Sequence, residues 1–176
     1  DWHVYTNFAQ KAAAKGIFPL FGLEIICLVP EFQAAGTKIN DPGNLGTIIR
    51  IADWYGIRHL LCSADTVDAF NPKVIASAKG SFLRVKLHYG DLAPWLAQAQ
   101  QPVYGAFLDG DSVHQLALPK AGGFIVLGNE ANGISDSIAA HVNRRVTIPA
   151  FGQAESLNVG IASAVIVDNL VRLSTK

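Results

Sequence analysis

The sequence lacks the features that mark disulfide-stapled or membrane-spanning proteins. It has only two cysteines, Cys27 and Cys62, and both lie in apolar, strand-like runs. A disulfide scaffold needs more, so we expect two buried thiols in a reducing compartment. The apolar stretch over residues 17–30 is interrupted by proline, glycine and glutamate, and no signal-peptide pattern precedes it. It is too short to cross a bilayer, so we expect a cytoplasmic protein with no membrane contact.

An excess of positive charge is also missing. Fourteen lysines and arginines balance fourteen aspartates and glutamates. The composition therefore excludes an overall basic nucleic-acid binder, and any RNA-binding face has to come from local clusters. Such clusters occur at Lys73, Lys79, Arg84 and Lys86, and at Arg144 and Arg145.

Several common functional sites are absent. No G-x-G-x-x-G follows a strand-like run, so a Rossmann dinucleotide site is unsupported. Gly128 and Gly133 have the spacing of a P-loop, but Ile134 stands at the lysine position. The five histidines are scattered without metal-ligand spacing, so no metal is expected. Ser156 lacks the G-x-S-x-G elbow of an acyl-transfer nucleophile.

The chain has 176 residues, half of them hydrophobic, which suits one globular domain over residues 1–176. Strand-like and helix-like segments alternate along it. This alternation predicts an α/β fold with a mostly parallel sheet and helices on both faces. The expected strands are residues 23–29, 57–62, 83–87, 103–108, 124–127 and 145–148. The expected helices are residues 7–15, 45–55, 72–79, 92–100, 135–142 and 157–173. Turns are expected at residues 41–43 and 109–111.

Three polar motifs interrupt this apolar pattern, at residues 44–50, 127–133 and 148–159. They read Asn-Leu-Gly-Thr-Ile-Ile-Arg, Leu-Gly-Asn-Glu-Ala-Asn-Gly and, within the third, Ile-Pro followed by Glu-Ser-Leu-Asn-Val. Each follows a strand-like run or a tight turn, where α/β folds gather ligands. Arg50 lies roughly 140° around its predicted helix from Leu45, well off the apolar stripe.

In this order and at these intervals, the motifs resemble the SpoU family of the SPOUT RNA methyltransferases. The resemblance extends over residues 41–172. It implies a parallel α/β sheet whose C-terminal third is threaded into a trefoil knot. It also implies one catalytic methyltransferase domain, with residues 1–30 as the remnant of an N-terminal extension. A homodimer through the C-terminal helix is expected, with a partner arginine completing the site.

The resemblance further implies transfer of a methyl group from S-adenosylmethionine (SAM) to a ribose 2′-hydroxyl of rRNA or tRNA, without a metal. The catalytic residues it implies are Asn44, Arg50, Glu130, Ser156 and Asn158. The cofactor-binding residues it implies are Ala106, Phe107, Leu108, Leu127, Gly128, Asn129, Ile148, Pro149 and Leu157.

The implied roles have structural alternatives. Arg50 suits the phosphate beside the target ribose, and that phosphate or Arg50 itself takes the proton; otherwise it is a solvated helix residue. Asn44 orients Arg50 or the ribose, or makes a turn. Ser156 and Asn158 bind the nucleotide or cap the last helix. Glu130 is assigned to holding the motif loops or Asn44. Two other functions stay open: a non-catalytic RNA- or nucleotide-binding module, and a base methylase.

Overall fold

A single parallel sheet forms the centre of the molecule. The computed structural model describes residues 23–28, 41–64, 66–116, 123–128 and 133–174. In these described residues, six strands run in the order β3-β2-β1-β5-β4-β6, and every neighbouring pair is parallel. Their bounds are β1 Leu23–Leu28, β2 His59–Ser63, β3 Lys86–Gly90, β4 Val103–Ser112, β5 Gly123–Leu127 and β6 Arg144–Thr147.

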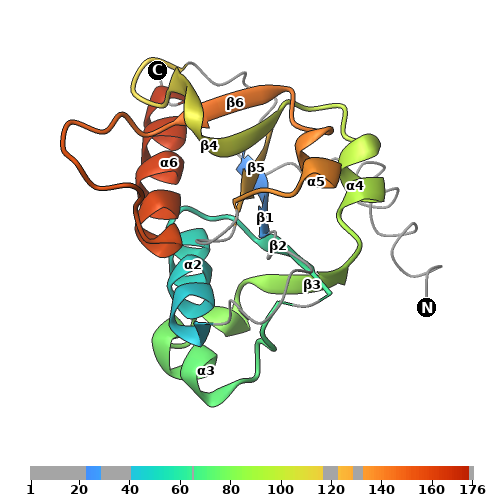
Figure 1. Cartoon of the computed structure of the whole chain (residues 1–176). Coiled ribbons are helices and arrows are strands. Elements are labelled where there is room, and N and C mark those ends of the chain that lie inside the picture. The colour runs from blue at the N-terminus through green and yellow to red at the C-terminus, as the bar shows by residue number, and fades with distance from the viewer. Residues whose placement is uncertain (1–22, 29–40, 65, 117–122, 129–132, 175–176) are drawn as a thin grey trace, which may run out of the picture.

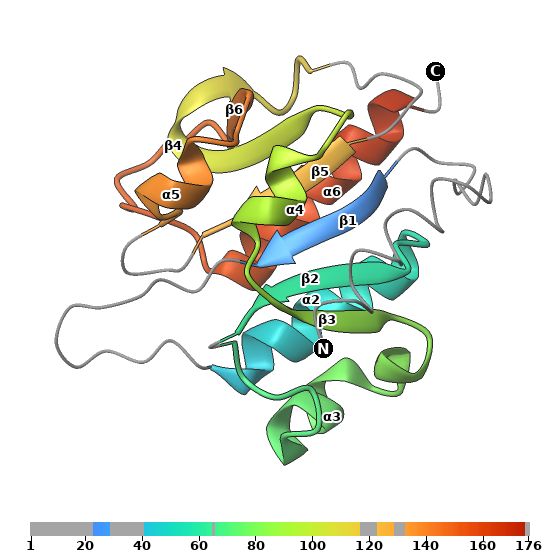
Figure 2. The same ribbon diagram turned by 90° about the vertical axis from the view of Figure 1, so that its right-hand side faces the viewer.

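Helices cover both faces of the sheet, which confirms the predicted fold class. α2, α3 and α6 lie on one face, and α4 and α5 on the other (Figures 1 and 2). The helix bounds are α2 Pro42–Trp54, α3 Pro72–Ala78, α4 Ala93–Ala97, α5 Asp136–Ala139 and α6 Val159–Ser174, with a 3₁₀ turn η1 at Ser81–Leu83.

Alternate side chains along the strands contribute to two hydrophobic cores, one on each face of the sheet. In β5, Ile125 and Leu127 join the core under α2 and α6, whereas Val126 joins the core under α4 and α5. Side chains of neighbouring strand residues point to opposite faces, so a strand covered on both sides is apolar throughout. This explains why the central strands read as continuous hydrophobic runs.

Helix α2 begins earlier than its apolar periodicity predicts. Asp41 is the N-cap, and its Oδ1 accepts a hydrogen bond from the Gly43 N–H at 3.0 Å. Pro42 takes the first helical position, where its missing N–H costs nothing. The expected turn at residues 41–43 is therefore the start of the helix, and Asn44 lies in its first turn.

The strand predicted at residues 83–87 is partly wrong. Lys79 and Gly80 have φ of 49° and 87°, which reverse the chain after α3 into η1. Asp53 at the end of α2 holds this turn, because it accepts hydrogen bonds from Ser81 Oγ at 2.7 Å and Arg84 Nε at 2.9 Å. The strand therefore begins only at Lys86.

Smaller differences affect other predicted elements. The turn expected at residues 109–111 lies inside β4, which runs on to Ser112. The helices α4 and α5 are shorter than expected, and Ser135 at the N-cap of α5 makes no side-chain cap bond. The helix expected at residues 7–15 lies outside the described residues.

Helices α2 and α6 run side by side in the same direction. Near their starts, Thr47 approaches Gly160, and at their far ends the Tyr55 hydroxyl donates to Asp168 Oδ1 at 2.8 Å. Cys62 is a buried free thiol, and burial raises its pKa to about 12. Within the part of the chain that the structure describes, no helix combines the length and apolar character needed to span a bilayer.

Candidate functional site

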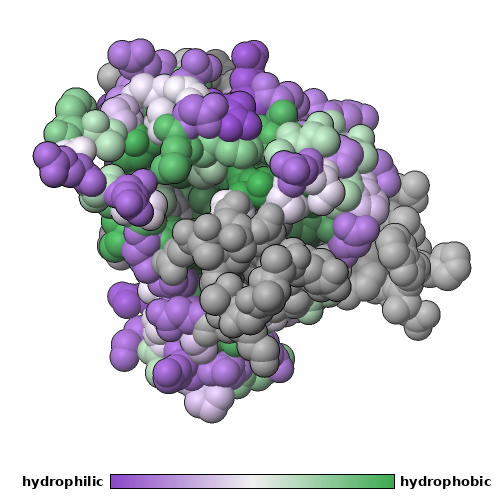
Figure 3. Space-filling model, viewed as in Figure 1, coloured by the Kyte–Doolittle hydropathy of each residue, from purple (hydrophilic) through white to green (hydrophobic). Residues whose placement is uncertain are grey.

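A pocket opens at the carboxyl edge of the sheet, where β4, β5 and β6 end. Parallel α/β folds bind ligands at this edge, because the strand ends and helix starts converge there. The pocket has a volume of about 690 Å³, within the range of small-molecule sites. In the space-filling view, hydrophobic surface gathers on this face among α6, β4 and β6 (Figure 3). We call it the carboxyl-edge pocket.

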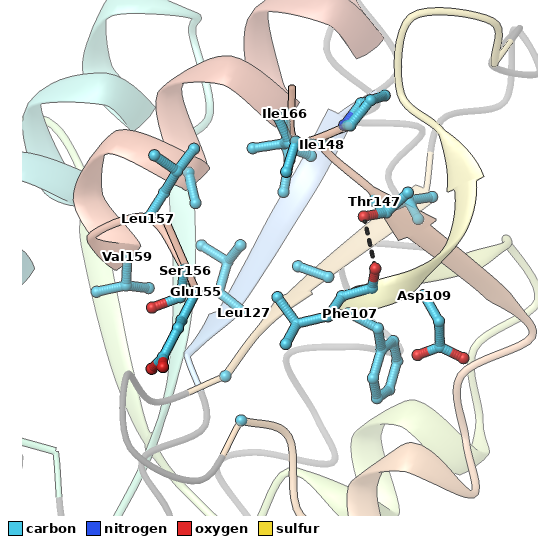
Figure 4. Close-up of a pocket in the computed structure, with 18 of the residues that line it drawn as sticks. Phe107, Asp109, Leu127, Thr147, Ile148, Glu155, Ser156, Leu157, Val159 and Ile166 are labelled. Atoms are coloured by element: carbon cyan, nitrogen blue, oxygen red, sulfur yellow. Dashed lines mark hydrogen bonds between the residues drawn. The ribbon is translucent and has the colours of Figure 1, made fainter. Parts of the chain in front are cut away.

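The lining comes from three stretches that are distant in sequence. They are residues 106–109 of β4, residues around the end of β5 and the start of α5, and the segment from β6 into α6. Figure 4 shows Leu127 between Phe107 on one side and Ser156 and Leu157 on the other. The lining residues are Ala106, Phe107, Leu108, Asp109, Leu127, Gly128, Gly133, Ile134, Val146, Thr147, Ile148, Pro149, Ala150, Phe151, Gly152, Ala154, Glu155, Ser156, Leu157, Val159, Ala162 and Ile166.

The predicted cofactor contacts coincide with this lining. Each of them lines the pocket except Asn129, which lies outside the described residues. Of the predicted catalytic residues, Ser156 lines the pocket and Glu130 lies outside the described residues. Prediction from sequence missed Asp109 and Thr147, although both stand within two residues of predicted contacts.

Gly128 makes the floor of the pocket possible. A Cβ at this position would lie 2.3 Å from the Gly133 carbonyl carbon and 2.5 Å from the Ile134 nitrogen. No other residue fits without moving that backbone, so the end of β5 and the start of α5 pass each other at a distance only glycine allows. The two glycines of this motif therefore allow the close backbone approach that shapes this side of the pocket.

The first and third motifs are joined by a direct hydrogen bond. Asn158 Nδ2 donates to Asn44 Oδ1 at 3.0 Å. Asn158 Oδ1 also accepts from the Gly160 N–H at 2.9 Å and the Ile161 N–H at 3.3 Å. Asn158 thus caps α6, as its sequence position suggested, and at the same time fixes the start of α6 to the first turn of α2.

Arg50 lies apart from the pocket of its own chain. Its side chain is exposed on α2, as its position off the apolar stripe predicted, and it is not among the lining residues. It shares the outer side of α2 with Trp54, which is 84% exposed. The described part of one chain therefore brings together the second and third motifs but does not bring Arg50 to them.

The pocket is apolar with negative charge at its sides. Asp109 and Glu155 are the charged lining residues, and they stand on opposite sides in Figure 4. A hydrogen bond from Arg145 lowers the pKa of Asp109, so that carboxyl is ionised at neutral pH. Within the described residues, no three metal-binding side chains gather at one place. Because Arg145 balances the charge of Asp109, Glu155 is the carboxylate left to face a ligand. The arrangement suits an organic ligand with a flat apolar part.

Comparisons with known proteins agree with this geometry. Residues 33–168 match the model of the SpoU rRNA Methylase family. The chain is 33% identical over 156 residues to the 23S rRNA (guanosine(2553)-2′-O)-methyltransferase RlmP of Bacillus subtilis, covering 82% of this chain and 62% of that protein. It is 29% identical to the 23S rRNA (guanosine-2′-O-)-methyltransferase RlmB of Neisseria meningitidis, covering 76% and 55%. The chain thus spans less than two thirds of these relatives.

A solved structure carries the same fold with its ligand. The AdoMet-bound rRNA methyltransferase of Sinorhizobium meliloti superposes with a TM-score of 0.75 at 26% identity, covering 88% of this chain and 58% of that one. Family match, sequence identity and fold agree over the region that contains all three motifs. The chain therefore belongs to the SpoU rRNA methylase family.

Proposed function

We propose that this chain is a SAM-dependent methyltransferase that acts on a ribose 2′-hydroxyl of rRNA or tRNA in the cytoplasm. One observation carries the proposal: the predicted cofactor contacts from three separate stretches line a single pocket. The similar proteins are named as rRNA 2′-O-methyltransferases, and one similar structure has AdoMet bound.

The pocket fits SAM in size and chemistry. Its volume of about 690 Å³ is ample for a nucleoside with an amino-acid tail. Leu127, Ile148 and Leu157 offer apolar faces for a flat base, and Gly128 lets backbone groups approach closely. Glu155 adds a carboxylate at the side of the pocket, whereas the charge of Asp109 is paired with Arg145. When bound, SAM supplies a methyl group on a sulfonium, which is already activated for transfer, so no metal is required.

The chain's own residues then have to position and deprotonate a weak nucleophile. The guanidinium of Arg50 can hold the phosphate beside the target ribose with two parallel hydrogen bonds. That phosphate accepts the proton as the 2′-oxygen attacks, since a guanidinium is normally protonated. Ser156, at the pocket wall, and the linked pair Asn44 and Asn158 fix the motifs around the nucleotide. Glu130 keeps its proposed role in holding the motif loops.

In a homodimer, the partner subunit would supply the arginine that one chain does not bring to its own pocket. Trp54, which is 84% exposed, lies one turn after Arg50 on α2, and Ile161 near the start of α6 is 55% exposed. Burying these side chains against a second copy would be favourable and would carry Arg50 toward the partner's pocket. We therefore propose that each site is completed by Arg50 of the partner subunit.

The test of activity is methyl transfer from labelled SAM to RNA. Arg50→Ala should abolish transfer and leave the affinity for SAM nearly unchanged. Arg58→Ala is the matched control, because Arg58 is an exposed arginine at the start of β2, on the opposite edge of the sheet. Turnover by Arg50→Ala equal to that of the wild type would remove Arg50 from the mechanism.

The test of the shared site is a mixing experiment. Arg50→Ala is combined with a variant whose pocket is blocked, Gly128→Ala. If Arg50 acts across a twofold interface, mixed dimers contain one intact site, and up to about a quarter of wild-type activity returns. If Arg50 serves its own chain, mixing restores nothing.

The rival functions are less well supported. The related proteins are named for ribose 2′-O-methylation, which favours neither a non-catalytic module nor a base methylase. Calorimetric titration with SAM tests the first rival, since a non-catalytic module need not bind it. Nuclease mapping of the methylated product distinguishes ribose from base modification.

We also propose that the backbone carries the trefoil knot implied by the family. Its support is the strand order, in which β5 inserts between β1 and β4, while α6 returns from the outer strand β6 to pack beside α2. When the chain is pulled by its two ends, its fully stretched length should be shorter than that of an unknotted chain with the same number of residues. A full extension would refute the knot.

A further inference from the structure

The wall of the carboxyl-edge pocket on the β4 side is a bulge. Ala106 and Asp111 both stand opposite Val146 of β6, so residues 107–110 loop out of the strand pairing. Three of the bulged residues, Phe107, Leu108 and Asp109, line the pocket, and Figure 4 shows Phe107 and Asp109. Bulges next to sites redirect side chains, and such a loop has few backbone bonds of its own to fix it.

Arg145 of β6 contacts both of these side chains. Its Nη2 forms an ion pair with Asp109 Oδ1 at 2.5 Å, and its Cζ lies 3.5 Å from the centre of the Phe107 ring. A planar guanidinium can stack on an aromatic face and bind a carboxylate with its edge at once, which an ammonium cannot. Arg145 itself does not line the pocket. Its influence on a ligand there has to pass through Phe107 and Asp109.

Two further contacts attach the bulge to β6. Thr147 Oγ1 donates to the Leu108 carbonyl oxygen at 3.2 Å. Gly110 has φ of 154°, and a Cβ there would lie 2.7 Å from the Arg145 carbonyl. The backbone of the bulge is thus bonded to β6 at Leu108 and passes close to it at Gly110, while the side chains of Phe107 and Asp109 are held by Arg145 among these contacts.

We propose that Arg145 is a positioning residue for cofactor binding: it holds Phe107 and Asp109 in the orientation that receives the cofactor. The proposal rests on the proposed function, because it takes the carboxyl-edge pocket as the SAM site. Without Arg145, both side chains are free to rotate, and the ligand has to order them when it binds. Removing the Arg145 side chain should therefore weaken cofactor affinity and leave the rate of the chemical step unchanged.

The experiment measures SAM binding by calorimetry for the wild type, Arg145→Ala, Arg145→Lys and Arg144→Ala. Arg145→Ala should weaken the affinity about fivefold, the size expected for losing a partly exposed ion pair together with a cation–π contact. Arg145→Lys should recover part of the loss, because it keeps the charge for Asp109 but lacks the planar stack. Arg144→Ala should bind as the wild type, because the neighbouring strand residue points to the other face.

Two readouts separate positioning from general destabilisation. If Arg145 only supports folding, Arg145→Ala reduces the fraction of binding-competent protein and leaves the dissociation constant of the rest unchanged; that result overturns the proposal. With saturating SAM, kcat of Arg145→Ala should equal that of the wild type, while the KM for SAM rises. A fall in kcat with an unchanged KM also overturns the proposal.

A second variant guards against misfolding. Asp109→Asn removes the ion pair and leaves Arg145 over Phe107, so it should weaken SAM binding less than Arg145→Ala. In the double variant the two losses should not add, because both act on one contact. Additive losses would overturn the proposal. If the wild type binds no SAM, the proposed function fails; if it binds but Arg145→Ala binds equally well, only the positioning role fails.

Discussion

Replacing Asn158 should destabilise the protein in a way that reveals its two separate roles. In Asn158→Ala, α6 loses an N-cap, which costs about 1 kcal/mol. The change also removes the hydrogen bond to Asn44, which contributes roughly 0.5–1 kcal/mol at an exposed site. The free energy of unfolding should therefore fall by about 1.5–2 kcal/mol, and Tm by roughly 3–8 °C for a chain of this size.

Asn158→Asp separates the two roles. A carboxylate still accepts from the Gly160 and Ile161 N–H groups, and its charge is favourable at a helix N-terminus. It cannot donate to Asn44 Oδ1, so only the link between helices is lost. We expect the free energy of unfolding of Asn158→Asp to lie less than about 1 kcal/mol below that of the wild type.

Changes at Asn44 provide the control. Asn44→Asp keeps the oxygen that accepts from Asn158 Nδ2, so it should have nearly wild-type stability. The double variant with aspartate at both positions places two carboxylates together and should be less stable than either single variant. The measurement is the midpoint of urea unfolding, compared among variants whose transitions have the same dependence on urea concentration. If Asn158→Asp is as unstable as Asn158→Ala, the cap is not what Asn158 contributes.

Two other changes probe the pocket and the opposite end of the sheet. Gly128→Ala should abolish detectable SAM binding while the protein remains folded, because the new methyl group collides with the Gly133 backbone; calorimetry beside circular dichroism tests this. Burial, with a smaller contribution from the neighbouring His88, lowers the pKa of His59 to about 4. Between pH 6.5 and about 4, the unfolded chain then binds a proton that the folded chain does not, so stability should fall as the pH drops through this range. The difference between the urea midpoints at pH 7 and pH 5 should become smaller in His59→Gln, with the remainder from His88, whose pKa burial also lowers; an unchanged pH dependence would contradict the assignment.

Much of the fold could be predicted from the sequence because its signals are local. The apolar runs that became β2 and β5 are buried on both faces, and periodicity located α2 and α6. The errors arose where a distant contact decides the local structure. The 3₁₀ turn at Ser81 depends on Asp53 of another helix, and the bulge in β4 depends on its pairing with β6. Neither contact leaves a pattern in its own segment.

The site was predictable in its parts and not in its assembly. Resemblance to the family assigned cofactor contacts from three stretches to one pocket, and the described ones line a single pocket. Asp109 was taken for a turn residue, because Asp-Gly-Asp is a strong turn signal. The contact between Asn44 and Asn158 could not be derived from spacing, since it depends on α6 returning to α2. Arg50 remains a prediction, because its place in a site depends on a second chain.

The order of strands has a consequence for how this protein is made. Strand β1 lies in the middle of the sheet, and Leu23 pairs with Gly123. During translation β1 can pair early with β2. Its other edge stays open until β5 has left the ribosome. Helix α6, which packs beside α2, emerges later still. An unpaired strand edge invites association with other chains, so the nascent domain is exposed to aggregation until β5 has been made. Acquisition of the native state has to wait for release of the last helix.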